Sequence, residues 1–114
     1  MAIMENLLET LGECGEAAAF YENQNILAVN KPFADLFERS PKEFTGKPLI
    51  EICHNDSIEM IQDFIHRRLH HDSDVPITYE CAFTTPSKPK IMLRVIALMF
   101  KKCGRSVLLL LREI

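Results

Sequence analysis

The feature that most constrains the fold is a two-residue apolar period in the last third of the chain. From Val75 to Phe83 apolar and polar residues alternate, which predicts a β-strand with one buried side. In the ranges 91–100 and 107–111 both alternating sets are apolar, and in the first of them only Arg94 interrupts the pattern. An antiparallel sheet with one wet face would place polar residues at alternate positions. The pattern therefore predicts a sheet that is covered on both faces.

Short elements precede these strands. Residues 1–13 carry apolar side chains at helical spacing and predict an amphipathic helix. Two short strands follow at 17–22 and 26–29, joined by residues that tolerate turn conformations, which predicts a hairpin. Asn30 precedes a Lys-Pro pair, and Ser40 directly precedes a proline. Each pattern is typical of a short helix with a capping residue at its start.

The longest helix is predicted from the apolar positions between Ile58 and Leu69, which recur at helical spacing. Asp56 or Ser57 is the expected cap at its start, and the helix should end near His70. The last two strands are predicted to be joined by a hairpin at 101–105, with Gly104 at a position of positive φ.

Length and composition favour one compact domain of the α+β class. The chain has 114 residues, of which 47% are hydrophobic and 25% charged, which is close to the globular average. The longest apolar runs, 95–100 and 107–111, are too short to cross a bilayer. The N-terminus lacks the basic start of a secretory signal. We expect a cytoplasmic protein, with no membrane-spanning segment in these 114 residues.

The C-terminal third is basic. Residues 86–114 contain seven basic residues and one acidic residue, although the whole chain has a net charge of −3. The basic residues alternate with apolar, strand-like runs and accompany no zinc-finger or recognition-helix pattern. We therefore expect no nucleic-acid partner.

Four short sequence motifs point to a known family. Asn30 follows the strand-like run Ile-Leu-Ala-Val, and the range 40–49 reads Ser-Pro-Lys-Glu-Phe-Thr-Gly-Lys-Pro-Leu. Residues 53–56 read Cys-His-Asn-Asp, and the chain ends in Leu-Arg-Glu-Ile. In order and spacing these strings resemble the PAS domain, a sensory module of histidine kinases and other signalling proteins. Glu113 replaces the aspartate of the Asp-Ile-Thr ending that many members have, and the threonine is absent.

The resemblance covers roughly residues 14–114. It implies a PAS-like α+β fold, with a five-stranded antiparallel sheet, short helices on one face and the N-terminal amphipathic helix, residues 1–13, on the other. It also implies a sensory and regulatory module within a larger signalling protein, followed by an output domain in the same polypeptide. A sensor histidine kinase is the expected parent, and a cyclase or a transcription regulator is the alternative. The module itself is expected to be non-catalytic.

The predicted interior is strongly apolar. It suits a core filled by its own side chains, which is the simpler interpretation, or a small apolar or weakly polar ligand. The residues expected to line it are Phe33, Phe37, Ile52, Ile61, Phe64, Ile65, Tyr79, Cys81, Val95 and Ala97.

Cofactor binding is disfavoured by the residues present. Flavin-binding relatives carry a reactive cysteine three positions after the glycine that matches Gly46, and this chain has Leu49 there. Haem-binding relatives carry a histidine where this chain has Ile61. No cofactor is therefore predicted, and a haem- or flavin-binding sensor remains the alternative.

The cysteines and histidines show no pattern typical of a reactive site. The four cysteines, Cys14, Cys53, Cys81 and Cys103, form no CxxC pair and are expected to be reduced. His66 and His70 stand four residues apart and could share a metal ion, but imidazolium near a helix C-terminus is stabilised without one. No metal site and no catalytic residue is predicted.

The apolar outer side of the sheet favours homodimerisation, because each exposed leucine forgoes about 2 kcal/mol of burial. The residues expected to form the dimer face are Leu7, Leu11, Ile96, Leu98, Phe100, Leu108 and Leu110.

Overall fold

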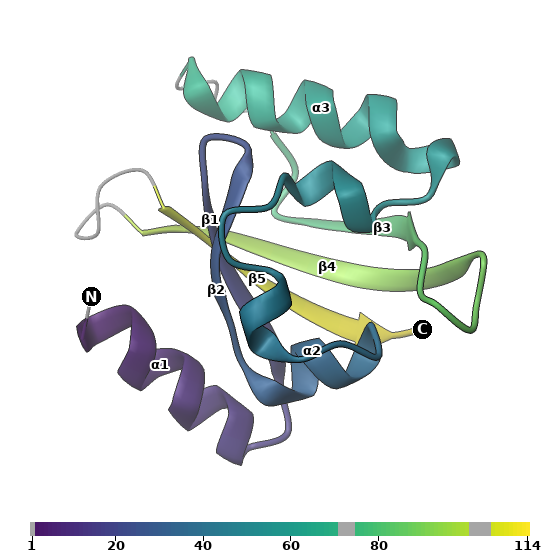
Figure 1. The fold of residues 1–114 in the computed structure, drawn as a ribbon. Helices are drawn as coiled ribbons and strands as arrows, with labels where there is room; N and C mark the ends of the chain where they lie inside the picture. Colours follow the sequence, from purple (N-terminus) through teal and green to yellow (C-terminus); the bar gives the residue numbers. More distant parts are fainter. Residues whose placement is uncertain (1, 71–74, 101–105) are drawn as a thin grey trace.

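A five-stranded antiparallel sheet forms the centre of the molecule (Figure 1). The computed structural model describes residues 2–70, 75–100 and 106–114. The strands follow the order β2-β1-β5-β4-β3, and their bounds are β1 (Ala17–Glu22), β2 (Asn25–Val29), β3 (Thr78–Phe83), β4 (Ile91–Phe100) and β5 (Ser106–Glu113). Because β5 lies between β1 and β4, the last strand joins the N-terminal hairpin to the two strands before it. The predicted fold class is confirmed.

In the described part of the chain, five helical segments accompany the sheet: α1 (Ala2–Glu13), α2 (Lys31–Leu36), η1 (Pro41–Glu43), η2 (Leu49–Ile52) and α3 (Asn55–Leu69). The segments from α2 to α3 pack on one side, which we name the inner face, and α1 packs on the other, the outer face (Figure 1). Gly46, at φ +80°, turns the chain between η1 and η2, a conformation that side chains with a Cβ rarely adopt.

Alternation along β1 assigns neighbouring residues to separate cores. Ala17, Ala19 and Tyr21 point into the large core under the helices of the inner face. Ala18 and Phe20 point the other way and form a small core with Leu108 of β5 and with Met4 and Leu8 of α1. Burial of both sides explains why the strand lacks polar residues at alternate positions.

The two-sided cover predicted from the sequence is present over only part of the sheet. Helix α1 covers the outer side of β1, β2 and β5. On the outer side of β4, Met92 is 43% exposed and Leu98 is 38% exposed. The outer face thus has a covered half and an apolar half that is open to solvent.

Two predicted boundaries are corrected. Helix α3 begins at Asn55, and its cap is His54, whose Nδ1 accepts a hydrogen bond from the backbone N–H of Asp56 at 3.0 Å. Neither Asp56 nor Ser57 caps it. Strand β3 begins at Thr78, and Ile77 is 57% exposed. The predicted hairpin at 101–105, with Gly104, lies outside the described residues.

Candidate functional site

The residues predicted to line a pocket all lie on the inner side of the sheet. Phe64 and Tyr79 are partly buried, and their ring centroids are 4.9 Å apart. The remaining eight are buried in the large core: Phe33, Phe37, Ile52, Ile61, Ile65, Cys81, Val95 and Ala97. The sequence therefore located the interior of the fold, and its use as a ligand site stays a prediction.

Aromatic rings fill the interior beneath α2. The ring centroid of Phe33 lies 5.0 Å from that of Phe37 and 5.5 Å from that of Phe44. The Phe37 centroid lies 5.6 Å from that of Phe83 on β3. Phe44 and Phe83 were absent from the predicted lining, although the alternation from Val75 to Phe83 already placed Phe83 on the buried side. This end of the interior is a packed aromatic core.

The other end of the inner face is more open. A groove of about 200 Å³ runs beside the C-terminal half of α3, and we name it the α3 groove. Ile50, Ile65 and Leu69 give it apolar walls, while polar side chains come from Gln24, Gln62 and His66. Ile65 is the residue of the predicted pocket that lines it. A groove with apolar walls and a few polar groups suits a small amphipathic molecule.

Arg68 lies next to this groove, on the adjoining side of α3. Its Nη2 donates a hydrogen bond to the carbonyl oxygen of Pro76 at 2.9 Å. A second, small cavity of about 10 Å³ lies against the same side chain and is also lined by Tyr21, Asn23, Met99 and Val107. Burial raises the pKa of the Tyr21 hydroxyl, and the nearby Arg68 charge opposes this shift. Tyr21 therefore stays protonated at neutral pH. No local sequence pattern signals that Arg68 and Tyr21 lie at one cavity.

His66 and His70 meet edge to face at the end of α3. Their ring centroids are 4.4 Å apart, with the planes 74° from parallel. Both side chains are exposed, and α3 ends at Leu69, directly before His70. The last turn of α3 is basic, which complements the negative end of the helix dipole.

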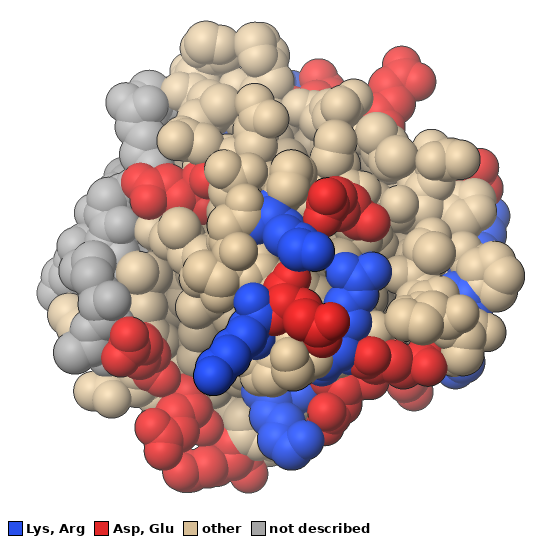
Figure 2. All heavy atoms as spheres, in the orientation of Figure 1, with Lys and Arg blue, Asp and Glu red and all other residues tan. Residues whose placement is uncertain are grey.

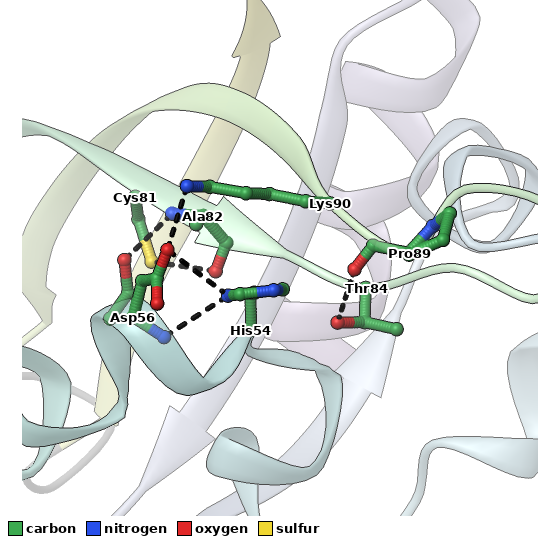
Figure 3. Close-up of polar contacts among 8 residues, drawn as sticks. His54, Asp56, Cys81, Ala82, Thr84, Pro89 and Lys90 are labelled. Carbon is green, nitrogen blue, oxygen red and sulfur yellow. Dashed lines mark hydrogen bonds and ion pairs between the residues drawn. The ribbon is translucent and has the colours of Figure 1, made fainter.

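The N-terminal end of α3 is fixed by a polar cluster (Figure 3). The carboxylate of Asp56 accepts a hydrogen bond from Lys90 Nζ at 2.7 Å, and it lies 3.6 Å from His54 Nδ1. The hydrogen bond from Lys90 and its charge lower the pKa of Asp56 below its ordinary value. His54 also donates its backbone N–H to the carbonyl of Ala82 at 2.9 Å, so the start of α3 is attached to β3.

Two buried thiols lie beneath this cluster. The Cys53 thiol donates a hydrogen bond to the carbonyl oxygen of Leu49, and the Cys81 thiol donates to that of Ala82, each at 3.6 Å. The neighbouring Cys81 thiol raises the pKa of Cys53, and burial raises it further. The neighbouring Cys53 thiol lowers the pKa of Cys81, against the effect of burial. Both thiols are free, as is the exposed Cys14, whereas Cys103 lies outside the described residues.

Ser57 connects this end of α3 to the sheet. Its Oγ accepts a hydrogen bond from the backbone N–H of Ala82 at 2.8 Å, and the serine is buried. Serine near a helix start is typical of a cap, which is why Ser57 is, with Asp56, a cap candidate in the sequence. The structure uses its hydroxyl for a tertiary contact instead.

The residues predicted to form a dimer face divide between two environments. Leu108 is buried under α1, and Leu7, Leu11 and Leu110 are partly buried around it. Ile96 is half-buried and Leu98 is exposed on the open half of the outer face. Arg94 is exposed beside them. The side chain of Phe100 lies outside the described part of the structure.

Charged side chains of both signs are interspersed on the face shown in Figure 2. Two basic residues of the C-terminal third form ion pairs, Lys90 with Asp56 and Arg112 with Glu16, the latter at 3.1 Å. Within the described residues, no helix is long and apolar enough to span a membrane.

Comparisons with known proteins give matches at the level of structure. No family model matches the chain, and no curated protein matches it in sequence. A domain of the sensory box sensor histidine kinase/response regulator from Geobacter sulfurreducens superposes with a TM-score of 0.74 at 12% identity, over 96% of this chain and 94% of that one. The PAS domain of an HTR-like protein from Haloarcula marismortui superposes with a TM-score of 0.72 at 18% identity, over the whole of both chains.

The chain has the PAS fold. The resemblance noted from Asn30, the range 40–49 and residues 53–56 is thereby confirmed for the fold. A third PAS domain with this fold is that of the Cronobacter turicensis quorum-sensing receptor RpfR in complex with C12:0. It has a TM-score of 0.71 and 10% identity, over 88% of this chain and 94% of that one.

Proposed function

We propose that this PAS fold is the sensory and regulatory module of a signalling protein, and that it performs no catalysis itself. The observation that carries the proposal is the fold, which matches domains of sensor histidine kinases over nearly the whole chain. A sensor histidine kinase is accordingly the proposed parent, with an output domain in the same polypeptide. A cyclase or a transcription regulator is the alternative parent.

The proposed signal is a small, largely apolar ligand bound on the inner side of the sheet. The α3 groove supplies apolar walls from Ile50, Ile65 and Leu69, and it lies beside the interior predicted from the sequence. One structural neighbour, the RpfR PAS domain, is described in complex with the C12:0 ligand. Apolar burial in such a groove contributes about 25 cal/mol per Å² of surface removed from water.

The proposed partner is a second copy of this chain, bound through the outer face. Met92 and Leu98 are exposed there, and they continue into the partly buried Ile96 and Leu110. In the sheet, Arg94 lies opposite Glu80, and both are exposed. A two-fold pairing of this surface would bury the apolar residues and place charges of both signs at the interface. Ligand binding on the inner side would then bias how the outer side packs.

The first experiment is native mass spectrometry of freshly purified protein, with an ultraviolet-visible spectrum of the same sample. A colourless added mass supports a small-ligand sensor, and a visible absorption band supports the haem- or flavin-binding alternative. A ligand-free mass at twice the chain weight supports a module that relays signals through dimerisation. A ligand-free monomer that takes up no small molecule would contradict the proposal.

A further inference from the structure

The guanidinium of Arg68 is held in place while one of its donors lacks a partner. Its Nη2 donates to the carbonyl of Pro76, which lies eight residues further along the chain. Its Nε is buried and has no hydrogen-bond partner among the described residues. A buried donor without an acceptor is costly, so native proteins nearly always supply one from protein, water or ligand. This donor therefore marks a position where an acceptor oxygen belongs.

The surroundings of Arg68 provide room for such an oxygen. The small cavity beside its side chain, about 10 Å³, is close to the space that one water molecule or one oxygen atom needs. Tyr21, protonated because burial raises its pKa, and Asn23 contribute polar groups to the same cavity. Met99 and Val107 complete it with apolar surface.

The small cavity and the α3 groove are neighbours. Ile65 and Leu69 line both, so the two spaces adjoin at these apolar side chains. A cationic donor next to an apolar groove matches a molecule with an anionic end and an apolar body. A carboxylate fits better than a phosphate dianion, because the cavity admits a single oxygen and offers one charged partner.

We propose that Arg68 recognises the carboxylate of a small aliphatic carboxylic acid whose apolar part lies in the α3 groove. One carboxylate oxygen accepts the hydrogen bond from Arg68 Nε within the small cavity, and the Tyr21 hydroxyl donates to the same group. This inference rests on the proposed ligand-sensing function and gives it a chemical class. The charge-assisted hydrogen bond to Arg68 supplies selectivity for the acid over uncharged analogues of equal length.

The test compares octanoate with 1-octanol, which has the same chain length and no charge. Binding is measured by calorimetry on the wild type, on Arg68→Gln and on the control Arg67→Gln. Arg67 is the preceding residue of α3 and lies 3.5 Å from Asp63, outside both cavities. We expect the wild type and Arg67→Gln to prefer octanoate, and Arg68→Gln to lose about tenfold in octanoate affinity with octanol affinity unchanged.

A second readout follows the wild type by nuclear magnetic resonance, in case Arg68→Gln folds poorly. The Nε–H resonance of Arg68, assigned by its absence in Arg68→Lys, should shift when octanoate is added and stay in place with octanol. Equal affinity for acid and alcohol, or an unmoved Arg68 resonance, overturns the carboxylate site while leaving an apolar sensing groove intact. Binding of neither molecule overturns both the carboxylate site and the α3 groove as a ligand site.

Discussion

The side-chain amide of Asn30 donates a hydrogen bond to the carbonyl oxygen of Leu8 at 3.1 Å, across 22 residues of sequence. The same amide donates to the carbonyl of Glu16 at 2.8 Å. Its oxygen accepts from the backbone N–H of Ala18 at 3.0 Å and from that of Phe33 at 3.1 Å. One buried side chain thus joins α1, β1 and the start of α2. It links the helix on the outer face to the helices on the inner face.

Replacing Asn30 with alanine should destabilise the whole domain. The substitution removes four hydrogen bonds and leaves buried backbone groups unpaired, so we expect a loss of about 2–4 kcal/mol in the free energy of unfolding. Urea denaturation measures this loss. The control is Asn6→Ala, an exposed asparagine on α1, for which we expect a change within about 0.5 kcal/mol. Similar losses for the two variants would contradict the role assigned to Asn30.

Asn30→Asp separates the two halves of this network. The aspartate keeps an oxygen to accept from Ala18 and Phe33, but it cannot donate to Leu8 and Glu16. We expect amide hydrogen exchange in α1 to accelerate more than exchange in α2. Equal acceleration in both helices would show that α1 is held by other contacts.

Ser57→Ala should weaken the attachment of α3 to β3. The change leaves the buried backbone N–H of Ala82 without its acceptor, which costs about 1–3 kcal/mol of unfolding free energy. Chemical denaturation measures the loss, and Glu59→Ala, at an exposed position on the same helix, is the control. A near-neutral Ser57→Ala variant would mean that the hydrogen bond contributes little to stability.

The ion pair of Asp56 should make the stability of the domain depend on pH in the acid range. Its pKa is lowered in the folded state, so its contribution to stability is present above its ordinary pKa of 3.8 and is lost as the pH falls through the folded-state value. Between pH 5 and about pH 2.5 the wild type should therefore lose more stability than Asp56→Asn. Urea midpoints measured across this range test the prediction. Parallel curves for the two proteins would contradict it, and Lys90→Gln should resemble Asp56→Asn.

Leu98→Glu should dissociate the proposed dimer and leave the fold intact. Leu98 is 38% exposed, so the monomer tolerates the charge, whereas the interface would have to bury it. We expect the dimer dissociation constant from sedimentation velocity to rise at least about tenfold. The same change at Ile77, which is 57% exposed ahead of β3, should have no such effect. A wild type that is monomeric at high concentration would remove the dimer from the proposal.

The sequence predicted most elements because their signals are local. Alternation marked β3 to β5, and helical spacing marked α1 and α3 within a few residues. The cap at His54 was missed because serine and aspartate are the stronger local candidates. The hydrogen bond that Ser57 accepts from Ala82 could not be predicted either, because its donor lies 25 positions away in the sequence.

The amino-acid sequence by itself determined the order of helices and strands, the apolar interior and the family resemblance carried by Asn30. Periodicity and turn residues act over a few positions, so they can be read along the chain. Only the tertiary structure decided which surfaces stay open and which polar groups meet. The strand order β2-β1-β5-β4-β3 brings Tyr21 of β1, Val107 of β5 and Arg68 of α3 to one cavity, and it confines α1 to half of the outer face. Such contacts follow from long-range packing, which no spacing of residues along the chain encodes.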